Sequence, residues 1–351
     1  QNRRQKQDKE ELYENTEQFL KEKAVYHTML NVAEDVSRGE VDTSDVLDKF
    51  EKSCNINLVT DLGLDLYSNI DTLIDDINSV EHYIPSKWDW LDNNLGGGFL
   101  EAGKSLYVFA GETNIGKSIF LGNIAHNIAK EGKNVLLITL EMSELLYARR
   151  ICSNVTKVPM KELVGNTPAI KQAIKDENGK IFIKEFPPAT ITANQLKGFI
   201  KKFQEQGIKL DAIVLDYLNL MHSTVGNNSY ERIKHVTEQV RAMSYLFECP
   251  IISATQLNRA GFDQDNPDLA TISESIGLAA TADVIVSIYQ NEEDRELGII
   301  RLGMMKNRYG PRGSTQAMRI NYSTLSIEEA DDIEFEDDGN ETLNVLAGLA
   351  S

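Results

Sequence analysis

The chain has 351 residues, of which 41% are hydrophobic and 26% are charged, and its formal net charge is −18. This length allows one large domain with an appended segment, and the composition is that of a chain able to bury a sizeable core. No apolar run is long enough to span a membrane and the first residues lack a secretory signal, so we expect a cytoplasmic protein without a membrane partner. The three cysteines are scattered, which argues against a disulfide framework and a zinc site.

Half of the net charge lies at the carboxyl end of the chain. Residues 320–351 contain nine Asp and Glu and no Lys or Arg. We therefore expect residues 323–351 to form a solvated acidic tail. The remaining body is only mildly acidic, so the net charge does not exclude a polyanionic partner, although the composition gives no positive support for one.

The first part of the chain is expected to be helical. Residues 8–36 and 44–53 show helical patterns, and we interpret residues 1–60 as one helical segment. Residues 61–84 contain an apolar stripe at helical spacing, which predicts a linker helix that packs either on its own domain or on a neighbouring subunit. The stripe consists of Leu66, Ile70, Leu73, Ile74 and Ile77.

From residue 105 onward, apolar strand-like runs alternate with helical segments. This rhythm predicts an α/β fold in which a mostly parallel sheet is covered by helices on both faces. Gly132 and Gly207 follow helical runs and are typical of helix ends that lead back into a strand. The predicted strands comprise residues 105–110, 134–140, 180–186, 211–217, 250–255, 283–289 and 300–306.

The stretch GETNIGKS lies between the first of these strands and a helical run. Its spacing is that of a P-loop, in which backbone amides surround phosphates, the lysine contacts the terminal phosphates and the serine binds Mg²⁺. An ordinary glycine turn is the alternative, but a strand-to-helix junction is the context that a P-loop requires. The predicted phosphate-binding residues are Gly111, Glu112, Thr113, Asn114, Ile115, Gly116, Lys117 and Ser118.

Three polar residues lie at or directly after the carboxyl ends of other predicted strands. Asp216 follows four apolar residues and has the form of the carboxylate that positions Mg²⁺ together with Ser118. Glu141 is the candidate general base for an attacking water, and Gln256 is placed to sense the terminal phosphate. Taken singly, each could be a solvated strand-end residue. Because ligands bind at the carboxyl edge of open α/β sheets, their joint occurrence favours a nucleotide-hydrolysing site.

Five motifs occur in order along the chain: GETNIGKS, LEMS, LDYLNLM, SATQLNR and KNRYGPRG. Together they resemble the ATPase domain of the DnaB-type hexameric replicative helicases, and ISESIGLAATADVI most resembles the bacteriophage branch of that family. The resemblance is dense over residues 85–322 and weak before them. It implies a RecA-like P-loop NTPase core that forms a homohexameric ring, binds ATP between subunits, moves 5′ to 3′ on single-stranded DNA and unwinds duplex DNA at the replication fork.

The resemblance also implies roles for individual residues. Glu141 would be the catalytic carboxylate, Asp216 the magnesium-associated carboxylate and Gln256 the phosphate sensor. Lys306 and Arg308 match the basic finger that reaches the ATP of a neighbouring subunit, where a cation stabilises charge in the transition state. A basic hairpin exposed to solvent is the alternative for these two residues.

The DNA-contacting loops of the family correspond to about residues 222–232 and 257–275. Both loops are rich in Gly, Asn and Ser, whose backbone amides can bind phosphates, and neither is strongly basic. Ser273 stands where cellular helicases carry an arginine, so Lys234 and Arg259 are candidates for its electrostatic replacement, with a solvated surface role as the alternative. The predicted DNA-contacting residues are Lys234, Arg259, Glu274 and Gly277.

The resemblance implies a primase and a helicase loader as further partners. Residues 1–60 would then be a remnant of the helical amino-terminal domain of the family, and a phage-encoded protein would work in the host cytoplasm. Two alternatives share the P-loop: a RecA-like or KaiC-like DNA-dependent ATPase without unwinding, and a structural ring component that only binds nucleotide. The intact Lys117 and Glu141 argue against an inactive ring, and KNRYGPRG favours catalysis across an interface.

Overall fold

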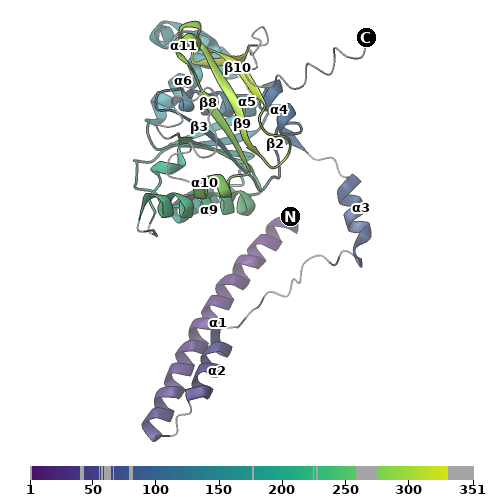
Figure 1. The fold of residues 1–351 in the computed structure, drawn as a ribbon, viewed down its shortest axis with the longest axis vertical. Coiled ribbons are helices and arrows are strands. Elements are labelled where there is room, and N and C mark those ends of the chain that lie inside the picture. Colours follow the sequence, from purple (N-terminus) through teal and green to yellow (C-terminus); the bar gives the residue numbers. More distant parts are fainter. Residues whose placement is uncertain are drawn as a thin grey trace, which may run out of the picture. The chain divides into compact units, whose positions relative to one another are not determined.

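The computed structural model describes residues 2–39, 43–54, 56, 58, 65, 67–78, 82–175, 178–223, 225–226, 228–257 and 276–330. The chain divides into two compact units, residues 1–80 and 81–351 (Figure 1). No helix in the described part of the chain is both long and apolar enough to cross a membrane.

The first unit is helical, as the sequence predicts. Its helices are α1 (Asn2–Arg38), α2 (Thr43–Cys54) and α3 (Ile70–Asn78). The first two lie side by side (Figure 1), and the hydroxyls of Thr28 and Ser53 share a buried hydrogen bond of 2.6 Å between them. α3 falls within the predicted linker and presents the exposed side chains of Ile70 and Ile74. Leu66, the first residue of the predicted stripe, lies outside the described residues.

The second unit is built on a large sheet, which contains nine strands within the described residues in the order β11-β10-β9-β8-β3-β7-β6-β4-β5. The strands from β8 to β5 are parallel, and β9, β10 and β11 continue the sheet antiparallel to one another. The strands are β3 (Leu106–Gly111), β4 (Asn134–Thr139), β5 (Lys180–Glu185), β6 (Ala212–Asp216), β7 (Ile251–Gln256), β8 (Val284–Tyr289), β9 (Ile299–Asn307), β10 (Thr315–Asn321) and β11 (Ser326–Glu329). A second sheet pairs β1 (Tyr83–Ile84) with β2 (Phe99–Leu100). The predicted mostly parallel α/β fold is confirmed.

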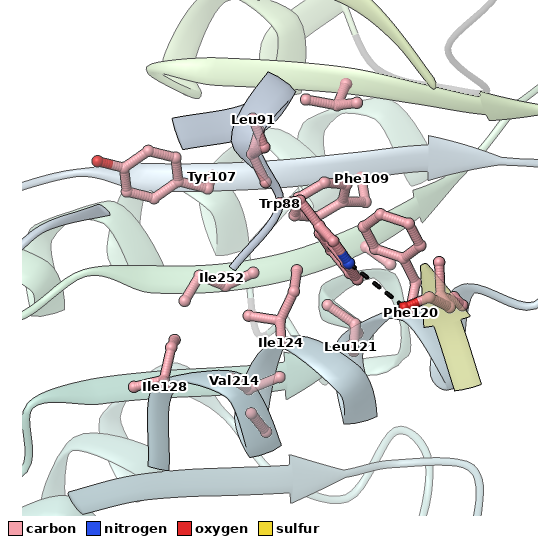
Figure 2. Close-up of a cluster of buried hydrophobic side chains, with 14 of the residues drawn as sticks. Trp88, Leu91, Tyr107, Phe109, Phe120, Leu121, Ile124, Ile128, Val214 and Ile252 are labelled. Carbon is pink, nitrogen blue, oxygen red and sulfur yellow. Dashed lines mark hydrogen bonds between the residues drawn. The ribbon is translucent and has the colours of Figure 1, made fainter. Parts of the chain in front are cut away.

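Alternate side chains of β3 face two different hydrophobic cores. Tyr107 and Phe109 lie in one core with Phe120 and Ile124 of α5 (Lys117–Lys130), as Figure 2 shows. Leu106, Val108 and Ala110 lie in the other core, together with residues of α8 and α9. Because both faces of these strands are buried, they appear in the sequence as continuous apolar runs. The remaining α-helices are α4 (Asp89–Asn94), α6 (Glu144–Thr156), α7 (Thr167–Lys175), α8 (Ala193–Glu205), α9 (Ser229–Phe247), α10 (Ile276–Thr281) and α11 (Glu292–Leu297), and 3₁₀ turns cover Met160–Asn166 and Leu218–Leu220.

Local sequence signals set several helix ends. Thr192 and Gln195 form a capping box at the start of α8, in which each side chain satisfies a backbone N–H of the other residue. Gly132 and Gly207, predicted to end α5 and α8, have φ angles of 76° and 73°. This left-handed conformation is the one that glycine adopts without strain after a helix.

The folded part of the chain extends further towards the C-terminus than expected. β11 pairs with β10, and Ile327 is buried while its carbonyl accepts a hydrogen bond of 3.4 Å from the indole of Trp88. The carboxylate of Glu329 accepts hydrogen bonds from the first two backbone N–H groups of α4, where an acidic group is favoured. The fold therefore includes residues up to 330, whereas the composition led us to expect a tail from residue 323. Residues 331–351 lie outside the described residues.

Candidate active site

The parallel strands bring the predicted catalytic residues to one edge of the sheet. In the register of the sheet, Gly111 at the end of β3 is paired with Gln256 at the end of β7. Thr139 at the end of β4 is paired with Asp216 at the end of β6, and Glu141 follows two residues after Thr139. The P-loop, Asp216, Glu141 and Gln256 therefore all lie along the carboxyl edge, where ligands bind in open α/β sheets.

The glycines of GETNIGKS are required by the backbone of the loop. Gly116 has a φ of 102° and precedes the first residue of α5. A Cβ at Gly111 would lie only 2.8 Å from Cγ2 of Ile115 and 2.9 Å from the carbonyl oxygen of Ile288. The loop thus leads directly into the amino end of a buried helix, whose free N–H groups and dipole favour an anion. This geometry suits a phosphate.

Lys117 is nearly buried at the first position of α5. Its ammonium donates hydrogen bonds to the carbonyl oxygens of Gly111, at 3.0 Å, and Glu112, at 2.5 Å. Burial lowers the pKa of Lys117 to about 8, while the charges of Asp216, Glu141 and Glu112 act in the opposite direction. The terminal phosphates of a nucleotide would supply the additional negative charge that favours the ammonium form.

Asp216 is fully buried, and neither of its carboxylate oxygens has a hydrogen-bond partner among the described residues. Burial raises the pKa of Asp216 to about 6, while the nearby hydroxyls of Ser118 and Tyr147 and the charge of Lys117 act in the opposite direction. The Tyr147 hydroxyl donates to the carbonyl oxygen of Ser118 and not to the carboxylate. A buried polar group without a partner is rare and calls for a ligand. Mg²⁺ fits this site, because it prefers oxygen ligands and commonly binds one or two protein groups together with phosphates and water. The described residues contain no group of three or more His, Cys, Asp or Glu that could hold a metal without a nucleotide.

Two tyrosines complete the carboxyl edge and were not predicted. Tyr147 of α6 is fully buried, donates a hydrogen bond of 2.9 Å to the carbonyl oxygen of Ser118, and has its pKa raised well above the ordinary value by burial. Tyr217 accepts a hydrogen bond of 3.1 Å from the side-chain amide of Gln256. The position of Tyr217 directly after Asp216 was a usable signal in the sequence, whereas nothing in the spacing of Tyr147 marks it.

Glu141 lies on the exposed rim of the site. The turn that carries it is held by the hydroxyl of Thr139, which accepts a hydrogen bond of 3.0 Å from the backbone N–H of Met142. The negative charge of Glu141 acts on the pKa of both Lys117 and Asp216, so Glu141 lies close enough to the phosphate-binding loop to influence its charges. An exposed carboxylate at this place can accept a proton from water.

The predicted basic finger lies at the opposite edge of the same sheet. β9 runs antiparallel to β8, with Lys306 paired with Ile285, so the chain reaches Arg308 beside the amino ends of β8 and β3. A strand of six residues such as β3 separates the two edges by about 17 Å. Arg308 therefore cannot reach the P-loop of its own subunit.

Lys306 is bound to its own subunit. Its ammonium donates hydrogen bonds of 2.6 to 3.1 Å to three carbonyl oxygens at the end of α10, those of Ala279, Ala280 and Ala282. Burial and the neighbouring Arg308 lower the pKa of Lys306. A lysine in this position satisfies helix carbonyls that otherwise lack donors and complements the helix dipole. The sequence contains no signal for this capping role.

The structure brings together two of the predicted DNA-contacting residues. Lys234 is exposed on α9, with its ammonium 3.9 Å from Glu238. Gly277 of α10 is buried, and a Cβ there would lie 2.7 Å from Cβ of Lys234, so the glycine allows the two helices to approach closely. Arg259 and Glu274 lie outside the described residues, and the roles of all four remain predictions.

A phosphate-binding loop, a buried carboxylate without partners in the described part of the chain and polar strand ends on one sheet edge define a P-loop nucleoside triphosphatase. Residues 84–325 match the family model of the DnaB-like helicase C-terminal domain. The chain belongs to this family of replicative DNA helicases, whose members are ATP-hydrolysing enzymes. The predicted family, RecA-like fold, enzyme class and use of ATP are thereby confirmed.

Individual relatives agree with this assignment. A DnaB-like replicative helicase of Enterobacteria phage T4 is 23% identical over 96% of this chain and 75% of its own length, in agreement with the predicted resemblance to phage proteins. A probable replicative DNA helicase of Trieres chinensis is 30% identical over 60% of this chain, which spans 50% of that relative's length. A solved structure of a DnaB-like replicative helicase and its interactions with primase has a TM-score of 0.64 over 91% of this chain and 78% of its own; at 18% identity it supports the fold alone.

Proposed function

We propose that the protein is the motor of a hexameric replicative helicase, which moves 5′ to 3′ on single-stranded DNA and unwinds duplex at the fork. The observation that carries this proposal is the division of the catalytic parts between two opposite edges of one sheet. Lys117 and Asp216 lie at the carboxyl edge, and Arg308 lies about 17 Å away at the amino edge. A head-to-tail ring, in which the amino edge of each subunit faces the carboxyl edge of the next, would complete every site.

In this mechanism, the amides of residues 111–118 and the ammonium of Lys117 bind the phosphates of ATP. Asp216 and Ser118 would hold Mg²⁺, which when bound neutralises charge on the phosphate oxygens. Asp216 supports this role because both its carboxylate oxygens are buried without partners among the described residues. The ion would satisfy them.

Three further residues would act on the terminal phosphate. Glu141 orients the attacking water and accepts its proton, and Gln256, held by Tyr217, contacts the phosphate from the adjacent strand end. Arg308 of the neighbouring subunit stabilises the negative charge that develops in the transition state, a contribution of about 10³ to 10⁵ in rate. Lys306 would act mainly by holding the finger strand against α10.

The remaining parts of the proposal concern domains and partners. Residues 1–60 would correspond to helices of the amino-terminal domain of the family, and residues 61–84 would be a linker that docks on the adjacent subunit. The DNA path would run over Lys234 and the predicted loop 257–275. A primase and a loader are the proposed protein partners, and the relative described with primase supports the first of them.

A strand-displacement assay on the full chain tests the helicase proposal. Forked duplexes with a 5′ tail or a 3′ tail on the loading strand are compared with ATP and Mg²⁺, while phosphate release is followed in parallel. We expect displacement only with ATP, Mg²⁺ and the 5′ tail. Hydrolysis without displacement would instead favour the RecA-like ATPase, and nucleotide binding without either activity would favour the structural ring component.

Mixing two inactive variants tests whether the finger acts between subunits. Arg308→Ala should bind ATP normally and lose hydrolysis, and Lys117→Ala should lose its own site but keep an intact finger. In mixed rings, some interfaces then combine an intact P-loop with an intact Arg308, so activity should return in part. Verified mixed rings that stay inactive would contradict a finger donated between subunits.

A further inference from the structure

Asp283, directly before β8, is the centre of a buried ion cluster at the amino edge of the sheet. Its side chain is 3% exposed. One carboxylate oxygen accepts hydrogen bonds from the backbone N–H of Leu106, at 2.9 Å, and from Nε of Arg241, at 3.0 Å. The other accepts one from Arg241, at 3.0 Å, and one from Arg308, at 2.6 Å. Every direction of this carboxylate is thus occupied by a donor.

Arg308 is attached to Asp283 at two points. Its backbone N–H donates to the carbonyl oxygen of Asp283 at 3.2 Å, and one terminal nitrogen of its guanidinium donates to the carboxylate. The other guanidinium donors have no partner among the described residues, and the side chain is 46% exposed. One end of the guanidinium is therefore fixed while the rest can bind an additional anion.

The surroundings of this cluster also suit an anion. An open hollow of about 340 Å³ lies beside Arg308 and is lined by Lys104 and Arg241 as well as by Asp283. The ring of Tyr245 contacts two of these side chains, with its centre 5.5 Å from the ammonium of Lys104 and 5.3 Å from the guanidinium of Arg241. The hollow is thus lined by three cationic side chains and one carboxylate, which leaves an excess of positive charge around it.

We infer that Asp283 is a positioning residue, which holds Arg308 ready for the terminal phosphate of the ATP bound by the next subunit. The inference rests on the proposed function, since it needs a finger that acts between subunits. Arg241 binds both carboxylate oxygens of Asp283 and so fixes the carboxylate. The carboxylate in turn binds only one nitrogen of the Arg308 guanidinium and leaves the other guanidinium donors available. A guanidinium held in this way loses little freedom when a phosphate arrives, and preorganised donors stabilise developing charge best.

The opposite role would be a latch, in which Asp283 competes with the phosphate for Arg308. A latch would release its cation when the phosphate arrives, and its removal would raise turnover. The double attachment and the unpaired donors of Arg308 favour positioning, because phosphate can bind without any of these hydrogen bonds being broken.

The test uses Asp283→Asn in the full chain. The amide keeps the size of the carboxylate and one acceptor for Leu106, but it no longer attracts the two arginines. We expect kcat for ATP hydrolysis to fall about 10- to 100-fold, the loss typical of a misplaced catalytic group, while ATP affinity stays unchanged. An unchanged or increased kcat would overturn the positioning role. Should Asp283→Asn fail to fold, Arg241→Gln tests the same cluster and should give a smaller loss of kcat.

Asp294→Asn is the matched control. Asp294 is also buried and is also bound through both oxygens by one arginine, Arg301, at 2.7 and 3.0 Å. It lies on α11, and its hydrogen bonds among the described residues involve neither Lys306 nor Arg308. Arg301 lies near the start of β9, five residues before Lys306. Its replacement should cost comparable stability and leave kcat within about twofold of the wild type. If both variants lose kcat equally, loss of stability explains the result and the inference fails.

Two combinations separate this inference from the proposed function. Asp283→Asn mixed with Lys117→Ala should regain activity, and Asp283→Asn added to Arg308→Ala should cause no further loss, because both changes act through the same guanidinium. If Arg308→Ala alone keeps its turnover, the proposed function fails. If Arg308→Ala loses turnover but Asp283→Asn does not, only the positioning role is overturned.

Discussion

Two buried aspartates, at opposite edges of one sheet, have opposite surroundings. Asp216 at the carboxyl edge has no hydrogen-bond partner for either oxygen among the described residues, and burial raises its pKa to about 6. Asp283 at the amino edge binds two arginines and a backbone N–H. The first carboxylate lacks the ligand that would satisfy it, and the second is already part of a completed scaffold.

This difference indicates that the two edges of the sheet have different roles at the nucleotide site. A carboxylate buried without partners costs free energy, which a bound cation can return, so the carboxyl edge is built for its ligand. At the amino edge the carboxylate of Asp283 is already paired and Arg308 presents spare guanidinium donors, so this edge is built to approach a ligand held elsewhere. Substitutions at the two edges should therefore have different consequences.

Among substitutions at the carboxyl edge, the largest effect is expected for Glu141→Gln. The amide cannot accept the proton of the attacking water, so we expect hydrolysis to fall about 10²- to 10⁴-fold while ATP binding is retained. Single-turnover phosphate release with prebound ATP measures this step. Mixing Glu141→Gln with Lys117→Ala should restore nothing, because both residues belong to the same edge and no mixed interface is intact. Recovery in that mixture would break the assignment of Glu141 to the carboxyl edge.

Lys117→Ala should affect binding as well as catalysis. Its ammonium contacts the phosphates before and during the reaction, so we expect weaker ATP affinity and a loss of hydrolysis of about 10²- to 10³-fold. Titration with a fluorescent ATP analogue measures the affinity. Arg308→Ala is the comparison at the other edge and should leave the affinity nearly unchanged. Equal losses of affinity in the two variants would contradict the division between the edges.

Asp216→Asn should change how stability depends on pH. The folded-state pKa of about 6 lies above the ordinary 3.8, so Asp216 contributes stability below pH 3.8 that is lost as the pH rises through 6. Asparagine does not titrate. The variant should therefore gain about 2 to 3 kcal/mol relative to the wild type between pH 4 and 8. Denaturant unfolding in a chelator, without nucleotide, measures this.

Asp283→Asn provides the contrast for this stability experiment. It removes the partner of two arginines, which are themselves partly exposed, so we expect a loss of about 1 to 3 kcal/mol at pH 7. At pH 7 the two substitutions should thus change the free energy of unfolding in opposite directions. If the difference in unfolding free energy between Asp216→Asn and the wild type does not vary with pH, burial does not raise the pKa of Asp216.

The sequence predicted the central sheet well because its strands are buried on both faces. Their continuous apolar runs end in Gly111, Asp216 and Gln256, and parallel strands necessarily bring such ends to one edge. The antiparallel extension was harder to predict. β10 mixes polar and apolar residues without strict alternation, and β11 contains Glu328 and Glu329, so the acidic composition obscured β11, whose Glu329 carboxylate caps α4.

The site was predictable where a motif has a fixed spacing, as in GETNIGKS. Tyr147 and Asp283 were not predictable, because they meet their partners through the tertiary fold: Tyr147 contacts a residue 29 positions earlier, and Asp283 binds Arg241 across 42 positions. Lys306 shows a further limit of prediction from sequence, because its motif predicted only a basic finger that reaches a neighbouring subunit. Its contacts with the end of α10 depend on how that helix packs beside β9.

The smallest effect is expected from removing residues outside both edges. Deletion of 331–351 should leave ATP hydrolysis and thermal stability unchanged, because all strands that the structure describes end before residue 331. Deletion of 327–351 should lower the melting temperature by several degrees, because it also removes the buried Ile327 and the Glu329 carboxylate that caps α4. Thermal unfolding of the two truncations, followed beside their ATPase rates, measures the difference. Equal melting temperatures would mean that β11 does not stabilise the fold. A loss of hydrolysis on deletion of 331–351 would mean that these acidic residues take part in the reaction, which the proposed roles of the two sheet edges do not require.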